Sequence, residues 1–275
     1  MTPEVPKAQY GLIGGSSTFS INFPEDLERP DLEVLGKELV FSTPYGNSPE
    51  FKLFNYQGKK VLTLKMHGWR RGVSRADASR QVFWVFRQAG VKKILAEGGV
   101  GSINHLLRPR DVVIPNDYID MSMRKDVELD GGFLLMMRQA VCPGLRQRLV
   151  EAAERHARGR VFDRSIYAVT DGRHFESPAE VQMLKVAGAD VIGQSMCPEV
   201  YLAREIGACY ARTDLVVNYA EGVIKDWEHQ ELADIFYGQN RAMGNILLDA
   251  LEDISTEQDC GCAELRKPTL LKEKR

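Results

Sequence analysis

The sequence predicts an α/β fold, with a single domain built around a largely buried β-sheet. Short β-type runs, each ending in glycine or polar residues, alternate along the 275 residues with longer segments of helical periodicity. Gly90, Gly188 and Gly207 each follow a helical segment and precede an apolar run, so a helix, glycine, strand pattern occurs three times. The even spread of apolar segments favours one domain.

The expected elements follow one another along the chain. Strands are predicted in QYGLIGG (9–15), KKVLTLKMHG (59–68), KKILAEGG (92–99), RDVVIPNDYI (110–119), RSIYAVTDG (164–172), ADVIGQS (189–195) and ACYARTDLVVNY (208–219). Helices are predicted at 75–89, 143–157, 178–187, 198–206 and 230–251. The helix at 178–187 has a clear start, because Ser177 supplies an N-cap hydroxyl, Pro178 suits the first helical position and Glu180 completes a capping box. A loosely ordered tail is expected after Ser255, with the charges of Lys267, Lys272, Lys274 and Arg275.

Composition and charge narrow the class of partner. Hydrophobic residues make up 44% of the chain, enough for a full core, and 36 Lys and Arg against 38 Asp and Glu leave a net charge of −2. This balance gives no general attraction to nucleic acid or anionic membranes. No apolar run approaches the roughly 20 residues needed to cross a bilayer, and MTPEVPKAQYG has no apolar signal core. We expect a soluble, cytoplasmic protein with a small-molecule partner.

The five cysteines fall into two groups. Cys142, Cys197 and Cys209 stand alone among apolar neighbours, where a small buried side chain is the usual role. The pair Cys260-Gly-Cys262 has the spacing for a very tight disulfide or for part of a metal site. With no second cysteine or histidine pair nearby in the sequence, we expect no zinc site and no other metal.

In the stretch YGLIGGSSTFS, Tyr10 to Ser20, two glycines and several hydroxyl side chains come after an apolar run. A glycine-rich turn after a strand lets backbone amides approach an anion, and serine hydroxyls donate further hydrogen bonds. The chain has no GxxxxGK[ST], and Gly14-Gly15 is not GxGxxG, so neither common nucleotide-binding loop is supported. A purely structural turn remains the alternative.

Glycine-rich or polar groups also follow the other predicted strands. They are Met66-His67-Gly68, Gly98-Gly99-Val100-Gly101-Ser102, Thr170 to Glu176, Gln194 to Glu199 and Val217-Asn218-Tyr219. Loops at the carboxyl ends of strands in a parallel or mixed sheet converge on one crevice. Together these segments resemble the trimeric purine nucleoside phosphorylase and methylthioadenosine phosphorylase family over about residues 10–251. The most specific matches are IGGS, G-x-x-F-E-S-P-A-E, GADVIGQSMCPEVYLAREIGACYA and VVNYA.

The resemblance implies a fold and a reaction. It implies one phosphorylase/hydrolase-like domain over residues 1–275, with a central mixed β-sheet flanked by helices, a core at about 10–252 and a tail at 253–275. Members of the family cleave the N-glycosidic bond of purine nucleosides with inorganic phosphate, which yields the free base and a ribose 1-phosphate for purine salvage. Phosphate is then a co-substrate, no cofactor is expected, and a homotrimer is the usual assembly.

The resemblance places a phosphate site at three strand ends. Its expected members are Ser16, His67, Gly98, Gly99 and Ser195, with His67 also in a catalytic role. One departure is Met66, which stands where the family has an arginine and so lacks a charge-assisted anion contact. Arg70 or Arg71 is then expected to hold the phosphate, unless the anion binds weakly. Ser195 as a cap of the following helix is the structural alternative.

The residues that match the nucleoside side point to a 6-oxopurine. They are Phe175, Glu176, Gln194, Asn218 and Ala220. Glu176 matches the glutamate that 6-oxopurine members aim at the N1 proton, and Asn218, expected to be catalytic at N7, stands where adenine-type members carry aspartate. These two positions favour inosine or guanosine, because an asparagine amide suits N7 and O6 whereas an aspartate suits an exocyclic amine. Gln194 replaces a methionine that usually lies against the ribose.

Several questions remain open at the level of sequence. The 5′ substituent of the nucleoside depends on whether His229 or Leu232 lines that end, so 5′-methylthioinosine is a further candidate substrate. Alternatives are a methylthioadenosine phosphorylase, a phosphate-independent nucleoside hydrolase, suggested by Met66, and a nucleoside-binding protein with impaired catalysis. In a trimer, the segments Phe83 to Phe86 or Met121 to Met137 are candidates for the interface. The Cys260-Gly-Cys262 motif resembles a C-terminal CxC of some thermostable relatives, where it is tied to disulfide chemistry.

Overall fold

Parallel pairing of four strands forms the middle of the sheet in the computed structural model, which describes residues 4–257 and 260–270. The four are β1 (Tyr10–Ile13), β6 (Lys59–Leu64), β7 (Lys93–Ser102) and β14 (Cys209–Tyr219). β1 lies between β6 and β7, and β14 lies on the other side of β7. Most of their side chains are buried, as expected for parallel strands covered on both faces.

Antiparallel pairs complete the sheet and make it mixed, which confirms the expected fold class. The main path through the described strands runs β11-β8-β14-β7-β1-β6-β5-β2, and β13, β12 and β9 extend the sheet from the end of β7. The bounds of these strands are β2 (Leu32–Leu39), β5 (Phe51–Tyr56), β8 (Val112–Val113), β9 (Asp117–Asp120), β11 (Val161–Phe162), β12 (Ile166–Val169) and β13 (Val191–Gly193). The strands β3 (Ser42–Thr43) and β4 (Gly46–Asn47) form a separate hairpin.

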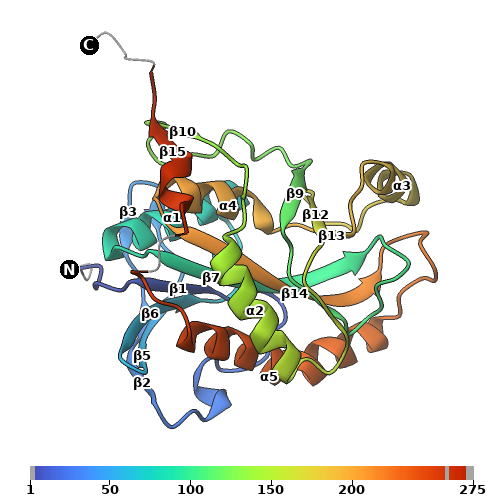
Figure 1. Cartoon of the computed structure of the whole chain (residues 1–275), viewed down its shortest axis with the longest axis horizontal. Helices are drawn as coiled ribbons and strands as arrows, with labels where there is room; N and C mark the ends of the chain where they lie inside the picture. The colour runs from blue at the N-terminus through green and yellow to red at the C-terminus, as the bar shows by residue number, and fades with distance from the viewer. Residues whose placement is uncertain (1–3, 258–259, 271–275) are drawn as a thin grey trace.

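Helices cover the sheet in two pairs. The helices are α1 (Arg75–Ala89), α2 (Pro143–His156), α3 (Pro178–Val186), α4 (Met196–Glu205) and α5 (His229–Glu252), with short 3-10 turns η1 (Glu25–Leu27), η2 (Met66–Gly68) and η3 (Cys262–Leu265). One pair is α2 with α5, and the other is α1 with α4. In Figure 1, α5 runs below β7 and β14, α1 and α4 lie above them, and α3 stands apart from both pairs. All five helices lie where the sequence predicts them, and the capping box of Ser177 and Glu180 is confirmed at the start of α3. Among the described residues, no helix combines the length and apolar character that a membrane span requires.

Two sequence expectations about individual segments are corrected. RDVVIPNDYI is not one strand, because it divides into β8 and β9 around Pro115, whose missing N–H cannot continue a sheet ladder. Phe83 and Phe86 are fully buried in α1 and pack edge to face, so their rings cannot reach a neighbouring subunit, and within this segment only the partly exposed Trp84 remains a candidate for the interface.

The expected loose tail after Ser255 is also wrong for its described part. Residues 262–265 form η3, and β15 (Arg266–Pro268) pairs antiparallel with β10 (Phe133–Leu135), with Lys267 opposite Leu134. Lys272, Lys274 and Arg275 lie outside the described residues.

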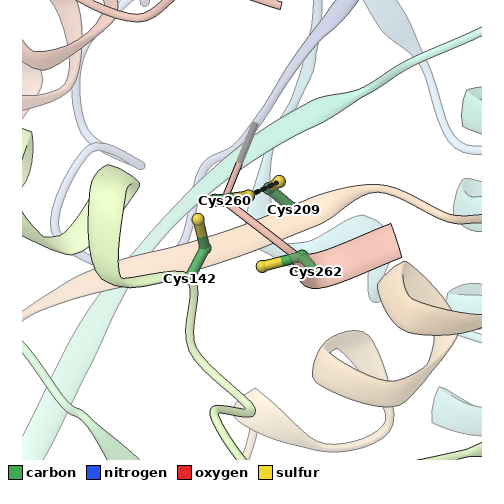
Figure 2. Close-up of side chains that lie close together, drawn as sticks. All are labelled: Cys142, Cys209, Cys260 and Cys262. Carbon is green, nitrogen blue, oxygen red and sulfur yellow. Dashed lines mark hydrogen bonds between the residues drawn. The ribbon is translucent and has the colours of Figure 1, made fainter. Parts of the chain in front are cut away.

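The cysteines are not arranged as the sequence suggested. Cys142, Cys197 and Cys209 are buried as expected. Cys142 and Cys209, however, lie beside Cys260 and Cys262, so the expectation that the CxC pair has no nearby partners is wrong (Figure 2). The sequence concealed this arrangement because the cysteines come from three distant segments.

The carboxyl ends of the central strands meet at one edge of the sheet. In β7 and β14, Gly98 lies opposite Asp214 and Gly101 lies opposite Asn218. The register shifts between Val216 and Asn218, a bulge that leaves one extra residue on β14. Because a bulge redirects the side chains that follow it, the β14 side chains beyond the bulge are turned relative to a regular strand.

Candidate active site

A cavity of about 870 Å³, including the space at its open mouth, lies at the converging strand ends. The part of this space that is open to a molecule the size of water measures about 210 Å³, which is somewhat below the roughly 300–1,000 Å³ of small-molecule sites. The structure brings every sequence-predicted site residue to its wall: Ser16, His67, Gly98, Gly99, Phe175, Glu176, Gln194, Ser195, Asn218 and Ala220. Residues that are far apart in the sequence therefore share one cavity, while their individual roles stay predictions.

A buried carboxylate shapes the glycine-serine loop that leads from β1. The Oε1 atom of Glu97 accepts hydrogen bonds from the Gly15 amide at 2.5 Å, the Thr18 amide at 3.1 Å and the Thr18 hydroxyl at 2.7 Å. Ser17 instead donates to the Gly98 carbonyl at 3.1 Å. Within the described chain nothing hydrogen-bonds to Ser16 Oγ, so this hydroxyl remains available to a ligand in the cavity.

Gly15 is required by close packing at this loop. A Cβ atom at this position would lie 2.2 Å from the Glu97 carbonyl oxygen and 2.7 Å from His67 Nε2. Both distances are shorter than any real Cβ contact, so only glycine lets the loop approach His67. This close contact explains the glycine at position 15 without a nucleotide-binding motif.

His67 is held by a chain of buried hydrogen bonds. Its Nδ1 lies 2.7 Å from Glu199 Oε1, and Tyr210 donates its hydroxyl to the other oxygen of Glu199 at 2.8 Å. The backbone of His67 adopts a left-handed conformation in η2, and its amide donates to the Gly14 carbonyl at 2.9 Å. Since Nδ1 is engaged by Glu199, Nε2 is the ring nitrogen left on the Gly15 side of the cavity.

Ser195 is positioned by an arginine that lies entirely inside the protein. Arg212 Nη2 donates to Ser195 Oγ at 3.1 Å, and the guanidinium makes two bonds to Asp214, at 2.8 and 2.5 Å. Ser195 makes no side-chain cap to α4, so the capping alternative is wrong. Because its oxygen already accepts from Arg212, the Ser195 hydroxyl keeps its proton free to donate to an anion.

The charge of Arg212 is maintained in spite of its burial. Arg212 and Asp214 have no exposed side-chain surface. Burial lowers the pKa of Arg212, but the Asp214 carboxylate together with Tyr167 and Tyr210 raises it more, and the net pKa lies well above its ordinary value. The Tyr167 ring, 4.7 Å from the guanidinium carbon, adds a cation–π contact. The guanidinium therefore supplies a fixed positive charge behind Ser195.

The two arginines expected to replace the missing one near Met66 do not reach the cavity. Met66 itself lines the wall, but Arg70 and Arg71 do not. Arg70 donates to the Gly68 carbonyl at 3.0 Å and to Gln81 at 2.6 Å, and Arg71 is exposed. The expectation that either of them holds the anion is wrong. Among the cationic side chains in the described part of the chain, Arg212 is the one that hydrogen-bonds to a residue predicted to bind phosphate, Ser195.

The residues predicted for the purine base form a second group among the residues that line the cavity. Glu176 and Asn218 are each 7% exposed, which makes any unmatched polar group of a ligand costly there. Thr170 donates its hydroxyl to Glu176 Oε1 at 2.5 Å, and Asn218 donates its amide to the Tyr219 carbonyl at 2.7 Å. Phe175 is 46% exposed at the mouth and meets Trp227 edge to face, with ring centroids 5.1 Å apart.

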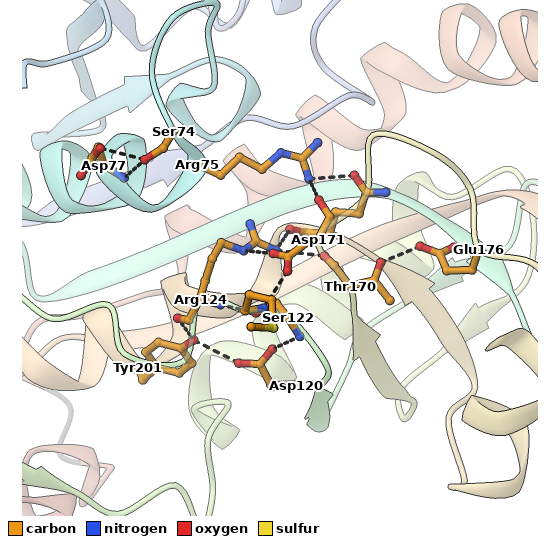
Figure 3. A network of polar contacts seen from close by, with 12 residues as sticks. Ser74, Arg75, Asp77, Asp120, Ser122, Arg124, Thr170, Asp171, Glu176 and Tyr201 are labelled. Atoms are coloured by element: carbon orange, nitrogen blue, oxygen red, sulfur yellow. Dashed lines mark hydrogen bonds and ion pairs between the residues drawn. The ribbon is translucent and has the colours of Figure 1, made fainter.

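Two arginines brace the loops that carry these residues (Figure 3). Arg75 donates to the side chain of Gln194 at 2.8 Å and lies 4.0 Å over the ring of Trp69. Arg124 donates to the carbonyls of Thr170 and Gln194, each at 2.9 Å. Two cationic neighbours therefore hold Gln194 in place, Arg75 through its side chain and Arg124 through its backbone carbonyl.

The apolar residues that line the cavity include Leu232 and Phe236 of α5 and, from η2, Met66. His229 is exposed at the start of α5 and lies outside the lining residues, so Leu232 is the one of the two candidates that reaches the cavity.

Sequence reasoning missed Glu199, Arg212, Asp214, Phe236 and Trp227. Two signals were present. The charges of Arg212 and Asp214 interrupt an apolar strand pattern, which marks them as buried, and Leu232 and Phe236 stand four residues apart on one helical face.

Comparisons with known proteins agree on a family. The sequence model described as "Phosphorylase superfamily" matches residues 11–252. A "Probable 6-oxopurine nucleoside phosphorylase" of Korarchaeum cryptofilum is 30% identical over 274 residues, which cover 93% of this chain and 97% of that protein. The "6-oxopurine nucleoside phosphorylase" of Pyrococcus furiosus is 30% identical, with coverage of 94% and 98%. A "Probable S-methyl-5'-thioinosine phosphorylase" of Methanothermobacter thermautotrophicus is also 30% identical, with coverage of 92% and 86%.

A solved structure shows the same fold. The crystal structure of a methylthioadenosine phosphorylase from an antarctic soil metagenomic library superposes with a TM-score of 0.79. It is 24% identical and covers 92% of this chain and 88% of that one.

The ion pair behind Ser195 is tested by two variants. We expect Arg212→Met alone to lower the free energy of unfolding by about 3–5 kcal/mol, because Asp214 is left buried and unpaired. The double variant Arg212→Met/Asp214→Leu should recover most of that stability. Its affinity for inorganic phosphate should still fall about tenfold, since a charge-assisted bond to Ser195 is lost.

Denaturant unfolding and calorimetric phosphate titration measure the two effects. The matched control Arg148→Met/Glu151→Leu removes an ion pair on the surface of α2 and should change neither quantity appreciably. Unchanged phosphate affinity in the stable double variant would show that Arg212 does not position Ser195.

Proposed function

This chain belongs to the Phosphorylase superfamily, and on that premise we propose that it is a purine nucleoside phosphorylase acting on 6-oxopurine nucleosides. It cleaves the N-glycosidic bond with inorganic phosphate and releases the base and a ribose 1-phosphate. One observation carries the proposal. A single cavity is lined by Ser16, Ser195 and His67, which we call its anion side, and by Glu176 and Asn218, which we call its base side.

The first side suits a phosphate that attacks the sugar. Ser16 and Ser195 donate hydroxyl hydrogen bonds, and the backbone of the strand end at Gly98 and Gly99 also lines the cavity. A phosphate oxygen forms the new bond to the anomeric carbon while the bond from that carbon to N9 breaks. Positive charge develops on the sugar in this step, so an anion held beneath it stabilises the transition state more than the bound substrate.

The second side suits the departing base. The electron pair of the broken bond passes to the purine, and hydrogen bonding from the Asn218 amide to N7 stabilises the charge that develops there. Glu176 accepts a hydrogen bond from the N1 proton of hypoxanthine or guanine. Adenine carries a lone pair at N1, which would face the carboxylate of Glu176 without a proton between them, so the 6-aminopurines are disfavoured.

The apolar lining residues Leu232, Phe236 and Met66 favour a further class of substrate, one with an apolar 5′ substituent. A 5′-hydroxyl placed against these side chains would lack a hydrogen-bond partner from them, whereas a methylthio group would bury apolar surface. We therefore include 5′-methylthioinosine among the substrates. The 30% identical relative of Methanothermobacter thermautotrophicus, named for that activity, is consistent with this choice.

The remaining expectations concern the setting of the enzyme. A cytoplasmic homotrimer that serves purine salvage, with no cofactor besides phosphate as co-substrate, is proposed from the family resemblance. Met121 and Met123, which are 47% and 86% exposed, leave apolar surface on the Met121–Met137 segment for a neighbouring subunit. A mass of three chains in light scattering would support this assembly, and the mass of one chain would exclude it.

The substrate assignment is tested by assaying base release from inosine, guanosine, 5′-methylthioinosine, adenosine and methylthioadenosine. With phosphate present, we expect kcat/KM for the three 6-oxopurines to exceed that for the two 6-aminopurines by about 100-fold, because a buried site rejects the base that leaves its polar groups unpaired. Faster cleavage of adenosine or methylthioadenosine would contradict the assignment.

The same assay without phosphate serves as the control for reaction type. Base release should fall to the background rate. Undiminished release would identify a nucleoside hydrolase, and binding of hypoxanthine with no turnover on any nucleoside would identify a binding protein.

Asn218→Asp tests how the base is read. The change places a carboxylate, which has no proton to donate, opposite N7 and O6 of a 6-oxopurine, which are both hydrogen-bond acceptors. We therefore expect kcat/KM for inosine to fall about 100-fold while that for adenosine rises. Steady-state kinetics measure both values. Asn55→Asp, the same substitution on β5 outside the cavity, should leave both unchanged. An Asn218→Asp enzyme with the original preference would show that this residue does not select the base.

A further inference from the structure

Four cysteines gather at the amino-terminal end of β14, away from the carboxyl strand ends that form the cavity. Cys142 is the N-cap residue of α2, and Cys209 is the first residue of β14. Cys260 lies just before η3, and Cys262 is the first residue of η3. All four sulfur atoms lie within 4.8 Å of one another (Figure 2). Three of the side chains are buried and that of Cys260 is partly exposed. The motif that the sequence left without a partner is therefore part of a four-thiol cluster.

The spacing of the sulfur atoms suits a tetrahedral metal ion. A zinc–sulfur bond measures about 2.3 Å, which places the sulfurs of a tetrahedral site about 3.8 Å apart. The upper limit of 4.8 Å and the 3.1 Å between the sulfurs of Cys209 and Cys260 bracket this value. Four thiolates also complete the coordination shell, so such a site is structural and holds no catalytic water.

The surroundings offset the charge of such a site. Four thiolates around one divalent cation carry a net charge of −2, which is costly to bury without positive neighbours. The amine of Lys93 lies 3.5 Å from Cys209 Sγ. Cys142 stands at the N-terminus of α2, a helix of 14 residues, where the helix dipole favours negative charge.

Disulfide formation is the competing use of these thiols. The sulfurs of Cys209 and Cys260 lie 3.1 Å apart, and a disulfide between them would leave Cys142 with Cys262, whereas a tight Cys260–Cys262 disulfide would leave Cys142 with Cys209. Each disulfide would release two protons and two electrons to an oxidant, and it would need each sulfur to approach only one partner. In the structure each sulfur lies within 4.8 Å of all three others, an arrangement that a metal requires and two disulfides do not.

We propose that Cys142, Cys209, Cys260 and Cys262 bind one zinc ion as a closed structural site. Binding converts the thiols to thiolates and releases their protons to solvent. The ion fastens residues 260–262 to α2 and β14, and this segment leads directly into β15, which pairs with β10. The chain before β10 carries Arg124, whose bonds to Thr170 and Gln194 brace the cavity. The site therefore stabilises one side of the cavity from a distance.

Metal analysis of the full-length wild-type chain tests the proposal. Protein purified with zinc present and then dialysed should retain about one zinc per chain, by the four-ligand stoichiometry. Replacement of zinc by cobalt should give the visible d–d bands and the near-ultraviolet sulfur-to-cobalt charge-transfer bands of a tetrahedral thiolate site. This spectrum needs no variant, so it does not depend on the folding of a mutant.

A pair of cysteine variants locates the site. Cys262→Ser should lose the bound zinc and lower the midpoint of thermal unfolding, because one of the four ligands is removed. Cys197→Ser is the matched control, since Cys197 is buried elsewhere and should leave both the zinc content and the cobalt spectrum unchanged. Zinc retained at full stoichiometry by Cys262→Ser would overturn the assignment of ligands.

A thiol titration of the chain unfolded in chelator distinguishes the competing chemistry. All five cysteines should react if the cluster holds metal. Protein without metal in which fewer than five thiols react would show disulfides and overturn the proposal. Five reactive thiols in protein that binds neither zinc nor cobalt would also overturn it. None of these outcomes depends on nucleoside turnover, so the zinc site and the proposed activity fail or succeed separately.

Discussion

The anion side of the cavity depends on one buried ion pair, Arg212 with Asp214. Both side chains are fully enclosed, and a bidentate pair of this kind offsets much of the large cost of removing its charges from water. The guanidinium donates to Ser195 and lies directly beneath Gly98, where an added Cβ would come within 2.8 Å of Nη2. Met66 leaves the usual place for a phosphate arginine without charge. The fold instead places a positive charge behind Ser195, and in the proposed site this charge acts on the phosphate through that serine.

The two sides of the cavity are built differently. On the anion side, Glu97 and Glu199 hold the serine loop and His67 through bonds within the central sheet and the elements beside it. On the base side, Glu176 stands on a loop after β12 that Arg124 braces from outside the sheet. The base side therefore depends on the long segment between β9 and β10. β15 pairs with β10 at the end of that segment, and the proposed zinc site would fix the chain that leads into β15.

Much of the fold was predictable because its signals are local. Caps and helical periodicity located α1 and α3, and continuous apolar runs located the central strands. The half-exposed β2 was missed because its charged residues, Glu33, Lys37 and Glu38, do not alternate regularly with apolar ones and resemble a surface segment. In the site, the resemblance to a family supplied the residues on the cavity wall. Arg212 and the cysteine cluster could not be obtained in this way, because their partners are set by tertiary contacts between distant segments.

The central claim is that the cavity directs phosphate, and not water, to the anomeric carbon of a 6-oxopurine nucleoside. Phosphorus-31 NMR of wild-type enzyme with inosine and phosphate tests it most directly, because it identifies the product that carries the sugar. The account predicts a ribose 1-phosphate signal that grows in step with the release of hypoxanthine, while the inorganic phosphate signal falls by the same amount. Hypoxanthine accumulating with free ribose, at a constant phosphate signal, would contradict it.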